Sequence, residues 1–279
     1  RIDMPTSTGA STAPMNVGAT DNRSISVRMT YYFFKQRDFN WYVSGNLNHN
    51  TTKYKKIGNL LEEYNERGQA STSLLRYYDN ASTTGVYAVR SAGIDPATGN
   101  EIFIKKDGSY TYEWKQSDEV LIGDSNPKVQ GALQTSLVYK GFSFGASFSY
   151  RVGGMISLST LFNKVENISS SQLKYNQDKR ALYDRWQKPG DKARFKRIDD
   201  TKSTNMSSRF IEEENTFSCN SINIGYRTST AEWLKYIGAS AFNFTAYMND
   251  IFRISSIKEE RGTSYPFERS VSFSIGLNF

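Results

Sequence analysis

The sequence predicts an all-β protein, a segment of an antiparallel transmembrane β-barrel with about seven spanning strands and long loops. Three observations predict it. Apolar and polar residues alternate along several segments, aromatic residues make up 14% of the chain, and the connections between the segments are alternately short and long. Neighbouring side chains of a strand point to opposite faces. The alternation therefore gives one face suited to lipid and one suited to water.

Residues 270–279 show the alternation most clearly. Val271, Phe273, Ile275 and Leu277 are large and apolar, and the residues between them are Ser or Gly. A tilted strand of about ten residues is long enough to cross a bilayer. The same pattern predicts seven spanning strands, near residues 24–34, 39–50, 130–139, 142–152, 216–227, 239–250 and 269–279.

Local signals support the strand boundaries. Lys140-Gly141 reads as a two-residue hairpin turn in which Gly supplies a positive φ. The apolar phase changes within 216–227, which predicts a β-bulge near Asn220-Ser221. Residues 231–238 predict a short helical turn that is closed by Gly238.

The short connections are 35–38, 140–141 and 228–238, and the long ones are 51–129, 153–215 and 251–268. Short periplasmic turns and long outer loops are typical of an outer-membrane barrel, so we expect the C-terminus in the periplasm. Within the long loops we expect helices over 57–67 and 173–186 and short strands over 85–92 and 101–105. Turns are expected at 95–99 and 106–108, and residues 5–20 read as a loop.

Composition excludes several classes. The mean hydropathy is −0.59 and no run of 18 apolar residues occurs, which excludes a helical membrane protein. The single Cys219 excludes a disulfide scaffold. The net charge of +7 is spread along the chain, where it can favour anionic lipid headgroups or acidic ligands, and nothing indicates nucleic-acid binding.

Catalysis is not expected. The chain has one histidine, His49, which reads as a rim residue, and it has no G-x-S-x-G or H-E-x-x-H motif. Glu212-Glu213-Glu214 reads as a solvated charge run rather than a calcium site, because the spaced ligands of such a site are missing. We therefore expect a protein that is not an enzyme and that needs no cofactor or metal.

Short motifs in a fixed order resemble the C-terminal portion of SusC/RagA-like TonB-dependent outer-membrane transporters of the Bacteroidota. Each is weak alone, but together they extend over nearly the whole chain. They lie at residues 5–9, 16–18, 92–100, 122–128, 137–143, 184–191, 208–211 and 259–267.

The resemblance implies a 22-stranded barrel filled by a plug domain and covered by a SusD-like surface lipoprotein. It implies import of glycans or oligopeptides through the outer membrane, driven by the TonB complex. Residues 1–279 are then expected to be the C-terminal part of the barrel, because the plug domain and the N-terminal strands have no counterpart in the sequence. The expected partners also include the remaining part of the same barrel, in the same protein or as a separate chain, together with outer-membrane lipid and the substrate.

Candidate contact residues lie in the loops and on the polar strand faces. Asp184, Arg185 and Trp186 form one motif, which is expected either to contact substrate or lid or to form the local core of its own loop; Tyr87 is a further candidate contact. Arg28 and Arg151 fall in the polar phase of their strands, where we expect them to face the lumen and pair with plug carboxylates.

One alternative remains open, a soluble or surface-attached all-β carbohydrate-binding module. A β-sandwich also alternates apolar and polar positions. Its strands would average five or six residues, and Phe142, Phe148, Val271 and Phe273 would be buried between two packed sheets.

Overall fold

The computed structural model describes residues 2–3, 6–9, 12–13, 16, 18–58, 61–69, 73–200, 202–258 and 269–279. The chain divides into two compact units. We call Arg1–Arg23, Thr51–Asn126 and Ser157–Ile211 the loop unit, and Ser24–Asn50, Pro127–Ile156 and Glu212–Phe279 the wall unit. Each unit is described by itself.

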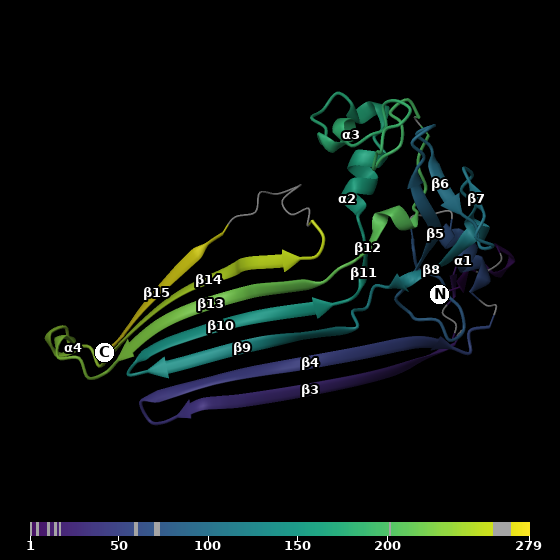
Figure 1. Cartoon of the computed structure of the whole chain (residues 1–279). Helices are drawn as coiled ribbons and strands as arrows, with labels where there is room; N and C mark the ends of the chain where they lie inside the picture. The colour runs from purple at the N-terminus through teal and green to yellow at the C-terminus, as the bar shows by residue number, and fades with distance from the viewer. Residues whose placement is uncertain are drawn as a thin grey trace. The chain divides into compact units, whose positions relative to one another are not determined.

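The wall unit is built on one antiparallel sheet of seven strands in the order β15-β14-β13-β10-β9-β4-β3 (Figure 1). All seven predicted spanning strands are present. Their bounds are Ala19–Lys35 (β3), Phe39–Lys55 (β4), Val129–Tyr139 (β9), Phe142–Val152 (β10), Thr216–Thr228 (β13), Ala241–Ser255 (β14) and Val271–Asn278 (β15).

The register keeps apolar residues opposite apolar residues across the sheet. Phe144 of β10 pairs with Leu137 of β9 on one side and with Ile224 of β13 on the other. The next position, Gly145, pairs with Ser136 and Asn223. Because directly paired residues point to the same side, the alternation of each strand adds up to one apolar and one polar face.

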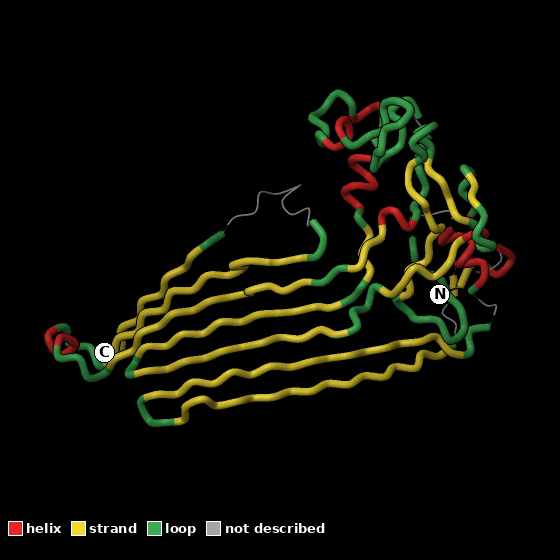
Figure 2. Tube along the Cα trace, in the orientation of Figure 1, coloured by secondary structure: helices red, strands yellow, loops and turns green. Residues whose placement is uncertain are grey.

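The apolar face is not covered by a second layer in the described residues. Phe142 is 56% exposed, Val271 53% and Phe273 68%, and Figure 2 shows the strands of this sheet side by side. Phe148 is half-buried beside Phe217, with ring centroids 5.6 Å apart. Strands of 8 to 17 residues with an uncovered apolar face contradict the sandwich alternative.

Aromatic side chains form two bands on the apolar face. One band runs across paired residues beside the short turns, namely Phe39, Tyr139, Phe142, Tyr226 and Phe244. The other contains Phe148, Tyr150, Phe217 and Phe252. Phe142 and Tyr150 are separated by about 27 Å at the rise of a strand, comparable with the apolar band of outer-membrane barrels.

The predicted irregularities of the sheet are confirmed. The register shifts between Cys219 and Ser221, which is the bulge expected at Asn220-Ser221. Lys140 and Gly141 both have positive φ, at 43° and 90°, as a type I′ hairpin turn requires. The short helix α4 (Trp233–Tyr236) ends before Gly238, whose φ is +69°.

The loop unit contains a four-stranded sheet in the order β7-β6-β5-β8. Its strands are Gly85–Ile94 (β5), Glu101–Ile104 (β6), Tyr110–Thr111 (β7) and Glu119–Asp124 (β8). The predicted strands 85–92 and 101–105 correspond to β5 and β6. The predicted turns 95–99 and 106–108 are present, with Gly99 and Gly108 at positive φ.

A small hydrophobic core lies beside this sheet in the loop unit. It consists of Leu161, Phe162, Val165, Ala181, Phe195 and Phe210. The chain enters it through α2 (Ser159–Leu161), a π-helical turn η3 (Phe162–Glu166) and η5 (Ser208–Phe210). The remaining short elements are β1 (Ile2–Asp3), η1 (Thr6–Thr8), β2 (Thr12–Ala13), α1 (Glu62–Gln69), η2 (Gln116–Asp118), β11 (Met155–Ser157), η4 (Ser170–Gln172), α3 (Arg180–Tyr183) and β12 (Ile211–Glu213).

Two predicted helices differ from the structure. The helix predicted over 173–186 is wrong except for α3, because Leu173, Tyr175 and Tyr183 are all more than 60% exposed and so bury no common face. The helix predicted over 57–67 begins only at Glu62, in α1. Ile57 lies before it, 2% exposed, and its amide donates to the Asp79 carboxylate at 2.8 Å.

The connection predicted over 251–268 begins later than expected, because β14 continues to Ser255. Residues 259–268, with the motif at 259–267, lie outside the described residues, as do parts of 5–20. In the part of the chain that is described, no helix is long and apolar enough to cross a membrane.

Gly131 gives a direct test of the sheet register. Tyr150 covers it from β10 and donates from its hydroxyl to the Asn46 carbonyl at 3.0 Å. A Cβ at Gly131 would lie 1.9 Å from that carbonyl oxygen and 2.6 Å from the Tyr150 hydroxyl. We predict that Gly131→Ala destabilises the folded sheet by about 1–3 kcal/mol, measured by urea unfolding in detergent. Gln134→Ala, on the polar face of the same strand, should change little. Equal stability of the two variants would contradict this register.

Candidate functional site

Two adjoining cavities of the loop unit form its candidate binding site. The larger, of about 600 Å³, is polar, and the smaller, of about 330 Å³, is mostly apolar. Tyr112 lines both. The polar cavity is lined by Asn100, Glu101, Phe103, Tyr112, Glu113, Trp114, Lys196, Arg197, Asp199, Asp200 and residues 202–205. The apolar cavity is lined by Ala92, Ile102, Tyr110, Thr111 and Tyr112.

Tyr112 is held by the turn that follows β5. Its hydroxyl donates to Asp95 at 2.8 Å, and the same carboxylate accepts from the Ala97 amide and the Thr98 hydroxyl at 2.9 and 2.7 Å. These bonds, the Ala97 amide first, lower the pKa of Asp95 below its usual 3.8. The hydrogen bond to Asp95 raises the pKa of Tyr112.

Opposite charges are paired in the wall of the polar cavity. Lys196 lies 3.3 Å from Asp200, and Arg197 forms an ion pair with Asp199. Glu113 lies 3.2 Å from Lys115. The cavity therefore offers donors and acceptors of both signs without a strong excess charge, which suits a polar or zwitterionic ligand more than a simple anion or cation.

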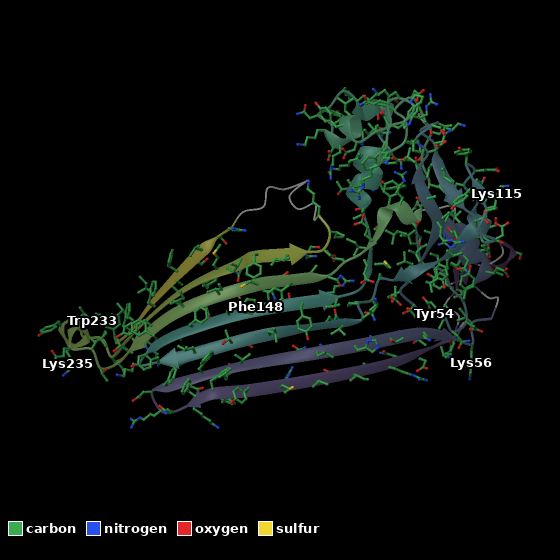
Figure 3. All side chains as sticks on the ribbon, viewed as in Figure 1. Tyr54, Lys56, Lys115, Phe148, Trp233 and Lys235 are labelled. Carbon is green, nitrogen blue, oxygen red and sulfur yellow. The ribbon has the colours of Figure 1, made fainter. Side chains whose placement is uncertain are left out.

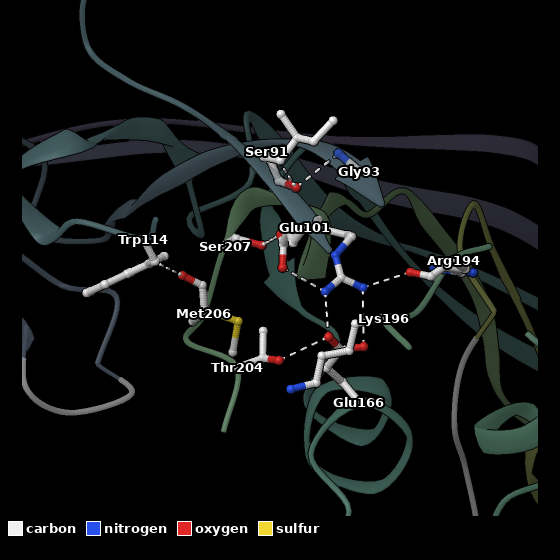
Figure 4. Close-up of polar contacts among 12 residues, drawn as sticks. Ser91, Gly93, Glu101, Trp114, Glu166, Arg194, Lys196, Thr204, Met206 and Ser207 are labelled. Carbon is white, nitrogen blue, oxygen red and sulfur yellow. Dashed lines mark hydrogen bonds and ion pairs between the residues drawn. The ribbon is translucent and has the colours of Figure 1, made fainter. Parts of the chain in front are cut away.

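The wall of the polar cavity rests on a buried ionic cluster, drawn in Figure 4. Arg209 lies 2.8 Å from Glu101 and 2.8 Å from Glu166, and the three side chains are 9%, 5% and 0% exposed. Ser207 donates to Glu101 at 2.6 Å, and Thr204 donates to Glu166 at 3.1 Å. The cluster thus ties strand β6, turn η3 and the segment before β12 to one guanidinium.

The predicted residues Arg185 and Trp186 lie behind this wall. Both are buried, at 6% and 8% exposure. Arg185 donates to the carbonyls of Glu166 at 2.7 Å and Lys196 at 3.1 Å, and it also contacts the Val165 carbonyl. Burial lowers the pKa of Arg185. Its bonds fix the backbone that carries a cavity-lining lysine.

Trp186 supports Arg197, another residue that lines the polar cavity. Its ring lies under the Arg197 guanidinium at 5.5 Å, and its indole N–H donates to the Pro96 carbonyl at 2.8 Å. A Cβ at Gly99 would meet this ring at 2.6 Å, so only glycine fits beside it. These contacts match the local-core interpretation of the motif; substrate or lid contact by Arg185 and Trp186 stays a prediction.

The other predicted residues are not gathered with them. Asp184 is exposed, and its carbonyl accepts from the Arg194 and Phe195 amides. Tyr87 is half-buried and packs on Tyr78, with ring centroids 5.6 Å apart. Their roles in binding stay predictions.

Arg28 and Arg151 belong to the polar face of the wall unit. Arg151 pairs with Gln130 and Thr216, and Arg28 alternates with apolar Val27 and Met29 on β3. The phase that was predicted for them is therefore present, whereas their pairing with plug carboxylates stays a prediction.

Sequence reasoning missed the aromatic run of the cavity. Tyr110, Tyr112 and Trp114 occur at every second position, which is a strand pattern, but β7 itself is only two residues long. No sequence motif marked residues 196–205 as part of a binding site. They line the same cavity as Tyr112 and Trp114 only because the folded chain brings the two segments together.

Comparison with known proteins bears on the fold. No protein-family model and no curated protein matches the chain. A solved structure of the RagAB peptide transporter matches with a TM-score of 0.71 and 17% identity, over 92% of this chain and 28% of that chain. This chain has the fold of that part of the RagAB transporter.

Two further RagAB structures agree. The peptide importer in its open-open state matches with a TM-score of 0.71 and 18% identity, over 92% of this chain. The closed-closed state matches with a TM-score of 0.72 and 18% identity, over 91%. This chain spans 28% of the RagAB chain in both. The fold class predicted from the sequence, an antiparallel segment of a larger β-barrel, is therefore confirmed.

Removing the central charge of the buried cluster should loosen the loop unit. Arg209→Gln leaves Glu101 and Glu166 buried without their cation, which costs about 3–5 kcal/mol. Local stability, measured by hydrogen exchange over residues 158–211, should fall accordingly. Arg197→Gln, which breaks the exposed pair with Asp199, should lower the local stability far less. Similar losses in both variants would refute a central role for Arg209.

Acid should release the turn that holds Tyr112. A carboxylate with a lowered folded pKa stabilises the fold above its unfolded pKa and ceases to do so as pH falls through the folded value. Protection of the Ala97 and Gly99 amides, corrected for intrinsic exchange, should therefore persist at pH 5 and be lost only below 3.8. In Asp95→Asn, whose side chain does not titrate, protection should not change over this pH range. Loss of protection near neutral pH would rule out this role of Asp95.

Proposed function

We propose that this chain forms part of the barrel wall and outer loops of a SusC-like, TonB-dependent importer of the bacterial outer membrane. The alternation of apolar and polar faces, kept in register over seven strands, carries the proposal. The likeness in fold to the RagAB structures supports it. The apolar face lies against lipid, and the polar face with Arg28 and Arg151 lies towards a plug-filled lumen.

The proposed partners follow from the two edges of the sheet and from the loops. Strands β3 and β15 are its outer strands, and the remaining part of the barrel pairs with them. A SusD-like surface lipoprotein closes over the long loops, which are extracellular, and the short turns and the C-terminus are periplasmic. The TonB complex acts through the plug.

Oligopeptides are the proposed cargo. A peptide presents a polar backbone and separate apolar side chains, which fits a polar cavity with paired charges beside an apolar pocket. The RagAB structures are described as a peptide transporter and importer, which points the same way. Glycans are the second candidate, because Tyr110, Tyr112 and Trp114 offer ring faces that stack on sugars.

The mechanism is binding and passage rather than bond chemistry. Substrate is captured between the outer loops and the lid, the plug is remodelled from the periplasm, and substrate crosses the lumen. Arg185, Trp186 and the Arg209 cluster keep the cavity wall in shape while the lid opens and closes.

Uptake by cells that depend on the complete transporter tests this function. We expect import of a fluorescent oligopeptide mixture and little import of oligosaccharides of similar size. Tyr112→Ala should lower peptide uptake about tenfold, because it removes a ring shared by both cavities. Tyr175→Ala is the matched control, since Tyr175 is an exposed aromatic of the same unit and is not placed in the cavity wall.

Three outcomes would count against the proposal. Uptake of neither substrate by a correctly inserted barrel would refute import. Preferential uptake of oligosaccharide would identify glycans rather than peptides as the substrate. Equal uptake by the Tyr112 and Tyr175 variants would remove the cavities from the binding site.

A further inference from the structure

One end of the wall unit gathers basic side chains that are far apart in the sequence. The turn 36–38 contacts the next turn through the Lys140 amide, which donates to the Asp38 carbonyl at 3.0 Å. The Arg227 amide donates to the Gly141 carbonyl at 2.8 Å, and α4 follows directly. We call this continuous edge the short-turn end.

Exposed basic residues at the short-turn end outnumber its exposed carboxylates, Asp38 and Glu232. Arg37, Lys140 and Lys235 are all exposed, and no ion pair in the described part of the chain involves them. The opposite end of the same sheet differs, because Lys128 lies 3.1 Å from Glu213 and Arg253 lies 2.9 Å from Glu214. The short-turn end therefore presents cations that are not engaged in ion pairs within the described residues, whereas the cations Lys128 and Arg253 at the other end are paired.

The loop after β13 adds an apolar surface at the same edge. Trp233 packs edge-on against Phe242, with ring centroids 5.3 Å apart, and Phe242 pairs with Leu277 on the apolar face. Leu234 is buried and anchors the loop, while Tyr236 is 88% exposed and Ile237 47%. Figure 3 labels Trp233 and Lys235 on this loop. The loop thus extends the apolar face of the sheet to the short-turn end.

The level of this edge matches a membrane interface. The aromatic band of Phe39, Tyr139, Phe142, Tyr226 and Phe244 lies just inside it. The Lys140 ammonium lies 5.4 Å from the ring centroid of Tyr139, so a charge and an aromatic ring of this band are held together. Amphipathic rings at the edge of hydrocarbon with cations directly beyond them are suited to lipid headgroups.

From these observations we propose that the short-turn end is a binding site for anionic phospholipid headgroups of the inner leaflet, called here the headgroup site. Lys140 and Lys235, with Arg37, bind the phosphates, and Trp233, Tyr236 and Ile237 lie among the glycerol and upper acyl regions. The inference rests on the proposed membrane location of the wall unit, with the short turns in the periplasm. It adds a preference for lipid charge that membrane insertion alone does not require.

Quenching of tryptophan fluorescence by brominated lipids tests the headgroup site in the complete transporter. The purified protein is placed in phosphatidylethanolamine vesicles that contain brominated phosphatidylglycerol or brominated phosphatidylethanolamine. The signal of Trp233 is the difference between the wild type and Trp233→Phe, since the chain has 4 tryptophans. Phosphatidylglycerol should quench it at several-fold lower mole fraction than phosphatidylethanolamine does.

The charge variants sharpen the test. Lys140→Gln and Lys235→Gln should each weaken the phosphatidylglycerol preference about fivefold. Arg227→Gln removes a charge from the same edge but on the polar face, where it pairs with Asn243, and should leave the preference unchanged. Lys115→Gln, in the loop unit, is a second control. Added inorganic phosphate should not compete with phosphatidylglycerol, because the headgroup site binds a headgroup that is held in a membrane.

Failure of this inference and failure of the proposed function are distinguishable. Equal quenching of Trp233 by both brominated lipids would refute the headgroup site but would still agree with a barrel embedded in lipid. A preference that survives in the Lys140→Gln, Lys235→Gln double variant would also overturn it. Absence of quenching by either lipid would contradict the membrane location itself, and displacement by free phosphate would indicate a soluble anion site instead.

Discussion

The structure depends on the register of the seven-stranded sheet. Each strand alternates by itself, but only the pairing places Phe144 beside Leu137 and Ile224, and Gly145 beside Ser136 and Asn223. A slip by one residue would turn polar side chains towards the apolar face along a whole strand. The bulge at Asn220 shows how strict this requirement is, because one extra residue restores the phase on the far side of β13.

The loop unit is organised by a different principle. It has a small apolar core and relies on buried polar contacts, above all Arg209 between Glu101 and Glu166. A buried cluster of this kind is sensitive to the loss of any member, and it fixes the positions of the segments that carry its members. Arg185 and Trp186 extend the same arrangement to Lys196 and Arg197, so the polar cavity keeps its shape through contacts made behind it.

Much of the wall unit could be predicted from the sequence, whereas in the loop unit only two strands and two turns could be, and the cavity could not. Period-two alternation, the Lys140-Gly141 turn and the phase change in 216–227 are local signals, and each corresponds to a feature of the sheet. The cavity depends on residues about 90 positions apart, such as Tyr112 and Lys202, and no local pattern links them. The helix expected over 173–186 failed for a related reason, since its apolar spacing had no partner surface to bury. Arg185 and Trp186 were recognised as important, but their support of the wall became visible only with their partners in place.

Spin-label accessibility along β10 shows directly which face of the sheet lies against lipid. Single labels at positions 144, 146, 147, 148 and 149 of the complete transporter in lipid, with Cys219 replaced by alanine, report collisions with apolar oxygen and with a water-soluble nickel complex. We expect high oxygen accessibility at positions 144, 146 and 148, and low oxygen accessibility at Ser147 and Ser149. Uniform accessibility along the strand, or oxygen maxima at the serines, would contradict it.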